Sequence, residues 1–196
     1  MTSVATAIAE VVALLESLEI PFVVGGSFAS AAWGQYRFTQ DLDIAALLSP
    51  DLVNDFVLFA EPEFLIDRVE VENALASSEE YRAFQMIHMH TMFKVDCFVP
   101  LNLDAVRDEF ARAVRLELVP GVVAPCLSAE DIVIRKLRWF EFGNRISDRQ
   151  WNDVVQVLEM QAGMLDEAYL NAVAERHGIR ALLNEARAGR GPSLGR

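Results

Sequence analysis

Strand-like and helical segments alternate up to residue 126, and only helical segments follow; this change of pattern most constrains the fold. Before it, apolar runs of strand length occur at 22–24, 42–46, 83–89 and 92–99, with shorter extended pieces at 114–119 and 122–125. Helical spacing accompanies them at 3–18, 27–33, 50–59, 67–75 and 103–113. After residue 126 it recurs at 128–141, 147–161, 166–177 and 179–187. We predict an α+β fold: a small mixed β-sheet flanked by helices, with a C-terminal helical subdomain.

The domain boundary is placed at Pro125-Cys126-Leu127. We predict a core over 1–126, a helical subdomain over 127–187, and a flexible tail over 188–196, which is rich in Gly, Pro and Arg. Residues 1–134 hold 7 basic and 21 acidic side chains, whereas 135–196 hold 10 and 8. An acidic front and a mildly basic back suggest two parts with different tasks, although chance scatter over two solvated surfaces would look the same.

Composition excludes several classes of protein. With 17 basic and 29 acidic residues the net charge is −12, which disfavours a generic nucleic-acid coat. Cys97 and Cys126 form no CxxC motif and no disulfide framework, so a reducing, cytoplasmic setting is expected. No apolar run reaches the ~18 residues of a membrane span, and Met1-Thr2-Ser3-Val4 does not begin a signal peptide.

A pair of carboxylates marks the second predicted strand. In Asp41-Leu42-Asp43-Ile44 the alternation of a strand places Asp41 and Asp43 on one face and the apolar residues on the other. Neighbouring carboxylates repel one another unless a cation lies between them. A hard divalent ion with oxygen ligands is the natural occupant. An acidic pair on a solvated strand, with no site, is the alternative.

Asp96 lies in a strand that is otherwise apolar. In the segment KVDCFV at 94–99 the apolar residues alternate with Asp96, so Asp96 shares its face with Lys94. A buried, unpaired carboxylate is costly, and a metal shared with the earlier acidic pair would remove that cost. A simple ion pair with a nearby Arg or Lys is the alternative.

Gly25-Gly26-Ser27 stands where the first strand turns into a helix. Glycines let a ligand approach the backbone, and a helix N-terminus offers free N–H groups to phosphate. The turn matches neither the Walker A loop nor the Gly-x-Gly-x-x-Gly fingerprint. A tight turn without a ligand is the alternative.

The order of these features resembles the DNA polymerase β superfamily of nucleotidyltransferases. There a Gly-Gly/Ser turn precedes an Asp-x-Asp strand, and a third Asp lies on a neighbouring strand. The stretch Arg37-x-Thr39-x-Asp41-Leu42-Asp43-Ile44 resembles the small prokaryotic branch, with AbiEii-like, minimal nucleotidyltransferase-like and toxin–antitoxin-related members. Less specifically, the helical half of AbiEii-like proteins resembles Ser128-Ala-Glu-Asp131, Lys136-Leu137, Arg145, Asp148 and Asp153.

The resemblance implies the nucleotidyltransferase fold and a two-metal reaction. A nucleoside monophosphate would pass from an NTP to a hydroxyl acceptor, with release of pyrophosphate. The implied catalytic and metal-binding residues, for Mg²⁺ or Mn²⁺, are Asp41, Asp43 and Asp96. The implied nucleotide-binding residues are Gly25, Gly26, Ser27, Arg37 and Lys136.

Alternatives stay open for the basic residues and the histidines. Arg37 contacts nucleotide or pairs with a neighbouring carboxylate, and Lys136 reaches a phosphate or extends from the core to water. His88 and His90 are spaced like metal ligands, but they fall at a predicted hairpin tip without a third nitrogen ligand. We therefore expect no metal there.

The sequence does not identify the acceptor. A protein side chain, a tRNA end and a small molecule are all used within the superfamily, and a homodimer is also open. The alternative function is a non-catalytic nucleotidyltransferase-like antitoxin or partner-binding module. The presence of all three carboxylates argues against it, because an inactive copy would tolerate their loss.

Overall fold

The structure is a computed structural model that describes residues 3–35, 39–79, 81–189 and 191. The chain forms two compact units. The sheet unit comprises Met1–Phe28 and Thr39–Cys126, and the helical unit comprises Ala29–Phe38 and Leu127–Arg196. The domain boundaries given above stay a prediction, and most of the predicted tail lies outside the described residues. In the part that is described, no helix combines the length and apolar character needed to cross a membrane.

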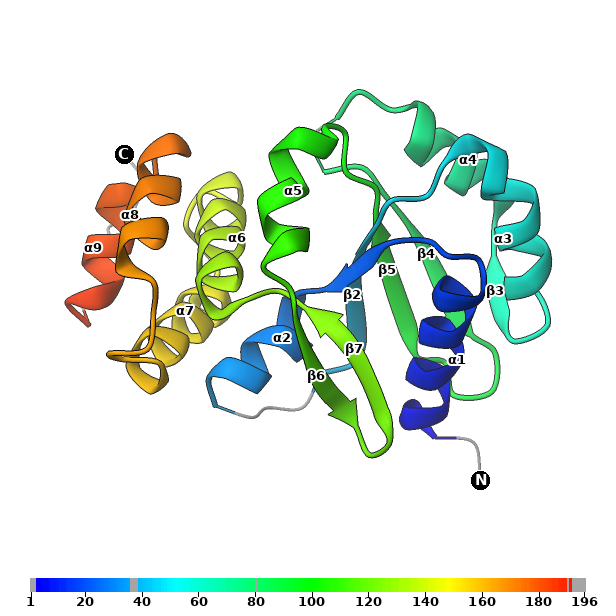
Figure 1. Cartoon of the computed structure of the whole chain (residues 1–196), viewed down its shortest axis with the longest axis horizontal. Helices are drawn as coiled ribbons and strands as arrows, with labels where there is room; N and C mark the ends of the chain where they lie inside the picture. The colour runs from blue at the N-terminus through cyan, green and yellow to red at the C-terminus, as the bar shows by residue number, and fades with distance from the viewer. Residues whose placement is uncertain (1–2, 36–38, 80, 190, 192–196) are drawn as a thin grey trace. The chain divides into compact units, whose positions relative to one another are not determined.

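A seven-stranded mixed sheet organises the sheet unit, in the order β3-β4-β5-β2-β1-β7-β6. The strands are β1 (Phe22–Val24), β2 (Asp41–Ala46), β3 (Phe64–Ile66), β4 (Ala83–His88), β5 (Lys94–Phe98), β6 (Val114–Val119) and β7 (Val122–Cys126). The β2–β5 and β1–β7 pairs are parallel and the other neighbours antiparallel. The predicted α+β class and mixed sheet are confirmed (Figure 1).

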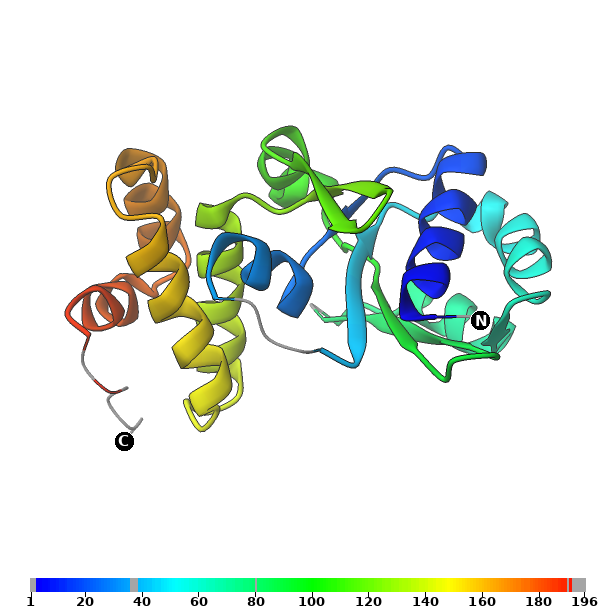
Figure 2. The same cartoon turned by 90° about the horizontal axis from the view of Figure 1, so that it is seen from below.

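Helices cover the sheet on the side that carries its apolar residues. They are α1 (Val4–Ser17), η1 (Pro50–Leu52), α3 (Val53–Ala60) and α4 (Arg68–Ala76). Helix α5 (Leu103–Ala111) also belongs to this unit. Ile8, Val11 and Leu15 of α1 are fully buried, as their helical spacing predicts, and they join one core with side chains of α3, α4 and the sheet. In both views α5 lies on the other side of the sheet from α1 (Figures 1 and 2).

Strand β3 is the element that the sequence does not predict. It has three residues and pairs antiparallel with β4 at the edge of the sheet. Phe64 is buried whereas Leu65 is 64% exposed. Because all three residues of the strand are apolar, the sequence does not reveal which of them faces the core. A segment this short carries too few positions to show a period of two.

The helical unit contains helices α6 (Ala129–Phe142), α7 (Asp148–Met160), α8 (Glu167–Arg176) and α9 (Arg180–Arg187). Ser128 caps α6 and Ser147 caps α7. Each serine side chain accepts a hydrogen bond from the backbone N–H three residues later, which confirms the predicted helix starts. Helix α2 (Gly26–Trp33) begins in the sheet unit and ends in this one. Here Trp33 donates from Nε1 to the carbonyl of Leu127, at 2.8 Å.

Candidate nucleotidyl-transfer site

The site is built on the alternation of strand β2. Leu42 and Ile44 are fully buried in the core shared with α1, so the intervening residues must face the other side of the sheet. Those residues are Asp41 and Asp43, and both are half-buried. Two carboxylates therefore stand side by side on the face opposite α1.

Strand β5 adds the third carboxylate to the same face. It runs parallel to β2, with Asp96 directly opposite Asp43 and Lys94 opposite Asp41. Val95 and Cys97 are fully buried in the core, so Asp96 faces the opposite way, alongside the pair on β2. Since neighbouring strands lie about 4.8 Å apart, the three carboxylates form one cluster on this face, although among the described residues their oxygens do not all lie within 4.8 Å of one another.

Lys94 and Thr39 hold two of these carboxylates. The Lys94 ammonium lies 2.7 Å from Oδ2 of Asp96. Its hydrogen bond to Asp96 holds the pKa of Lys94 above the ordinary value, and the charges of Asp96, Asp41 and Asp43 act in the same direction. Thr39 donates from its hydroxyl to Oδ1 of Asp41 at 2.8 Å. The ion pair that the sequence left open for Asp96 is thus present, with Lys94 as the partner.

The glycine turn packs directly against Asp43. The Gly25 amide donates to the Asp43 carbonyl at 2.9 Å. Gly26 has φ +55°, and a Cβ added there would lie 1.7 Å from Oδ2 of Asp43. Only glycine tolerates both this backbone conformation and this approach. Ser27, which follows in the first turn of α2, is buried.

Two further residues are predicted to bind nucleotide. Arg37 lies outside the described residues. Lys136 belongs to the helical unit, where it is buried and its ammonium lies 2.8 Å from Oδ2 of Asp153 and 3.1 Å from Oε1 of Gln150. The structure therefore brings Asp41, Asp43, Asp96 and the Gly25-Gly26-Ser27 turn together.

The donor set fits a hard divalent cation. Three carboxylates converge on one face, and Mg²⁺ and Mn²⁺ prefer oxygen ligands. The backbone lies close enough to Asp43 to exclude any side chain at residue 26. A triphosphate bound through the N–H groups of the turn would therefore meet metal held by the carboxylates.

Sequence reasoning missed the role of Thr39 and did not single out Lys94 as the partner of Asp96. Each lies two residues from an acidic member of the cluster, on the same strand face or just before it. In an extended segment that spacing puts side chains on one face. The patterns Thr-x-Asp-x-Asp on one strand and Lys-x-Asp on the other therefore predict that Thr39 and Lys94 lie beside the carboxylates.

Solved structures of nucleotidyltransferases share this fold. The complex of ANT(2'')-Ia with adenylyl-2''-tobramycin has a TM-score of 0.58 and 16% identity, over 90% of this chain and 99% of that one. An antigenic nucleotidyltransferase-like protein from Paracoccidioides brasiliensis has a TM-score of 0.51 and 16% identity, over 95% and 93%. Lincomycin-bound LnuA, a lincosamide antibiotic adenylyltransferase, has a TM-score of 0.50 and 14% identity, over 76% and 93%.

Sequence comparison gives the family. A search of curated proteins finds no match to this chain. The model of the nucleotidyl transferase AbiEii toxin family, of type IV toxin–antitoxin systems, matches residues 12–192. That match spans both units, including the Asp-x-Asp strand, Asp96 and the C-terminal helices. With its fold, its carboxylate cluster and this match, the chain belongs to the AbiEii family of nucleotidyltransferases.

Proposed function

We propose that the chain transfers a nucleoside monophosphate from an NTP to a hydroxyl acceptor. The observation that carries this proposal is the cluster of Asp41, Asp43 and Asp96 against the Gly25-Gly26-Ser27 turn. The family supports nucleotidyl transfer in general. Mg²⁺ dependence, the NTP, the acceptor and the cytoplasmic setting are parts of the proposal.

Each part of the cluster has a distinct task. Asp41, Asp43 and Asp96 would hold the divalent cations, which when bound neutralise the triphosphate and acidify the acceptor hydroxyl. The N–H groups of Gly26 and Ser27 orient the β and γ phosphates, since the Gly25 amide is bonded to the Asp43 carbonyl. The acceptor oxygen forms a bond to the α phosphorus while the bond to the bridging β oxygen breaks, and pyrophosphate leaves. Asp96 accepts the acceptor's proton.

Lys94 takes part in this proposal as a competitor for the carboxylates. Its ammonium stabilises the acidic cluster as an internal cation. Cation binding at Asp96 requires the Lys94 ammonium to move away, and at 36% exposure its side chain has room to do so.

The same ion pair favours the second candidate, a non-catalytic partner-binding module. A built-in cation satisfies Asp96 without metal, so the three carboxylates do not by themselves require catalysis. The two candidates differ in whether nucleotide binding depends on a divalent cation.

The relatives differ in what they suggest about the acceptor. ANT(2'')-Ia was solved with adenylyl-2''-tobramycin and LnuA with lincomycin, whereas the family name refers to a toxin. A protein, a tRNA end and a small molecule therefore stay as acceptor classes.

Thermal unfolding with each NTP tests the proposal. We expect stabilisation with Mg²⁺ and no gain in EDTA, because phosphates and carboxylates repel one another without the cation. A ligand at a hundredfold excess over its Kd stabilises by ~2.7 kcal/mol. Equal stabilisation in EDTA, or none with any NTP, contradicts the proposal and favours the partner-binding module. Incubation with α-labelled NTP and fractionated lysate then assigns the label to protein, RNA or small molecules.

A further inference from the structure

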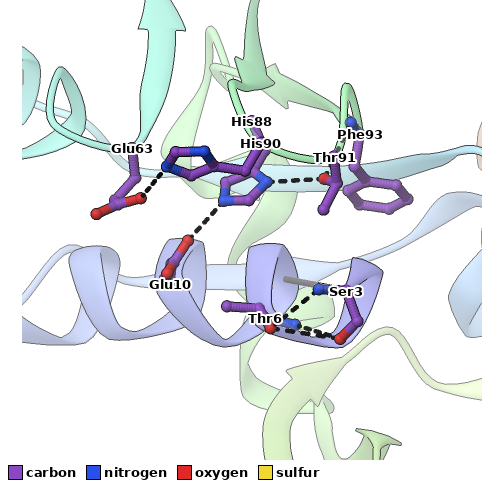
Figure 3. Close-up of polar contacts among 8 residues, drawn as sticks. All are labelled: Ser3, Thr6, Glu10, Glu63, His88, His90, Thr91 and Phe93. Carbon is purple, nitrogen blue, oxygen red and sulfur yellow. Dashed lines mark hydrogen bonds and ion pairs between the residues drawn. The ribbon is translucent and has the colours of Figure 1, made fainter. Parts of the chain in front are cut away.

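A second group of ligand-type side chains gathers beside helix α1 (Figure 3). It consists of Glu10 on α1, Glu63 just before β3, His88 at the end of β4, and His90 in the following turn. Along β4 the buried residues alternate and end with His88, on the face that α1 covers, whereas Gln85 on the other face pairs with Asp96. The group is therefore separate from the nucleotidyl-transfer site.

The backbone holds these residues in place. Phe64 pairs with His88 across β3 and β4, and the Met89 amide donates to the Glu63 carbonyl at 2.9 Å. The side chain of His88 is fully buried, and its Nδ1 lies 2.7 Å from the hydroxyl oxygen of Thr91. That hydroxyl also accepts from the Phe93 amide. The imidazole is thus fixed with its Nε2 close to Glu10.

The contact between His88 and Glu10 is incomplete. Nε2 of His88 and Oε2 of Glu10 lie 2.8 Å apart, and both atoms are buried. The distance suits a hydrogen bond, yet the direction does not, so neither atom has a hydrogen-bond partner. Buried polar atoms are rarely left in this state, and a bound ion is one of the arrangements that completes them.

The ligand atoms lie at metal-binding separation. One atom each from Glu10, Glu63 and His88 lies within 4.8 Å of the other two. Two ligands bound to one tetrahedral Zn²⁺ at ~2.0–2.2 Å are about 3.4 Å apart, so the side chains must shift by ~1 Å to bind the ion. His90 adds a nitrogen 3.6 Å from Oε2 of Glu63. A ligating imidazole usually bonds through its second ring nitrogen, as His88 does to Thr91.

We propose that Glu10, Glu63, His88 and His90 bind one Zn²⁺ ion. Imidazole with carboxylate oxygens suits Zn²⁺, whereas Mg²⁺ prefers oxygen alone. The ion joins α1, the turn before β3 and the β4–β5 hairpin, which are far apart in sequence. Its role is structural: it fastens the end of the sheet to α1, and it takes no part in phosphoryl chemistry.

The test uses the whole, tag-free chain after chelation and removal of the chelator. Co²⁺ titration followed by visible absorption, with Zn²⁺ competition, should give one ion per chain and a higher Tm. Glu63→Gln should lower Zn²⁺ affinity at least ~tenfold. Because Glu63 is 42% exposed, this variant should fold as well as wild type. Glu61→Gln, at an exposed carboxylate in the same turn, is the matched control and should bind normally.

Two further outcomes decide the proposal. Asp43→Asn should leave the Co²⁺ spectrum and Zn²⁺ affinity unchanged, since Asp43 lies on the other face of the sheet. Absence of stoichiometric Zn²⁺ binding overturns the proposal and leaves His88 and Glu10 as an ion pair. Equal losses in the Glu61 and Glu63 variants, or loss in Asp43→Asn alone, overturn it as well.

Discussion

At the scale of single residues, Asp43 connects the two halves of the proposed site. Its carbonyl accepts the Gly25 amide, and its carboxylate lies against the α carbon of Gly26. The main chain of Asp43 therefore positions the phosphate-binding turn, and its side chain takes part in the proposed metal binding. A side-chain substitution separates these tasks, because the carbonyl remains.

Asp43→Asn should abolish nucleotidyl transfer and leave the apo protein's Tm level or slightly higher. The amide keeps the shape of the carboxylate, removes one charge from an acidic cluster and weakens metal binding. Incorporation of α-labelled NTP and apo thermal unfolding measure the two effects. Asp51→Asn, at an exposed carboxylate of η1, should change neither. A large fall in apo Tm would show that Asp43 holds the fold and is not a metal ligand.

Gly26→Ala should destabilise the protein more than Gly121→Ala. Both glycines have positive φ, which costs alanine about 1–2 kcal/mol. A Cβ at residue 121 meets nothing within 4 Å, whereas one at residue 26 overlaps the Asp43 carboxylate. Overpacking of this kind adds ~1–3 kcal/mol. Urea unfolding of the two variants gives the difference, and equal losses would mean that the turn does not press on Asp43.

The sequence predicts where a side chain lies when a single strand determines its orientation. Strand alternation places Asp41 and Asp43 on one face because Leu42 and Ile44 must be buried. It says nothing of Glu10, Glu63 and His88, because these come from segments that only the tertiary fold brings together. The sequence-based expectation of no metal at His88 rested on the lack of a third nitrogen ligand nearby. It did not consider carboxylates that are distant in the sequence.

At the scale of elements, the register of β2 on β5 is what the sequence leaves undetermined. Helix spacing predicts α1, and capping serines predict α6 and α7, since these patterns are local. The pairing of Asp43 with Asp96 depends on which strands become neighbours and how far they slide. The expectation that Asp96 lies beside Asp41 and Asp43 came from the superfamily resemblance. The hydrophobic periodicity of the strands does not predict it.

Helices α6 and α7 are joined by a buried ion pair whose loss should be costly. Lys136 and Asp153 are 5% and 6% exposed. Lys136→Met removes the cationic partner of the buried Asp153 carboxylate, so we expect a loss of ~3–5 kcal/mol. The double variant Lys136→Met/Asp153→Leu should recover most of it. Urea unfolding measures both. An unchanged stability with lost NTP binding would instead support the nucleotide-binding role predicted for Lys136.

At the scale of the whole molecule, the two cysteines report on opening of the sheet unit. Cys97 and Cys126 are free and fully buried in its core. Burial raises the pKa of the Cys126 thiol from 9.0 to about 12, and it raises the pKa of Cys97 as well. Since the thiolate is the reactive form, both thiols are protected in the native protein.

Native protein should therefore react with a thiol reagent at pH 8 at least ~100-fold more slowly than unfolded chain, with both cysteines labelled together. Raised folded-state pKa values stabilise the fold below pH 9, where both states are protonated. That contribution is lost as the pH rises from 9 toward 12, because the unfolded thiols ionise first. Stopped-flow labelling and Tm against pH check both statements. Rapid labelling of one cysteine alone would contradict cooperative opening.

Because the chain crosses between the units after residues 28, 38 and 126, the helical unit is encoded in two separate stretches of the gene. Trp33 and Gln35 from the first stretch bond to Leu127, Gln156 and Gln161 from the second. Recombination that exchanges only the C-terminal helices keeps the backbone acceptors at Trp33 and Leu127, but it can replace the side-chain donors Gln156 and Gln161. A chimaera joined at residue 126 should therefore be more stable when residues 29–38 come from the same parent as its helices.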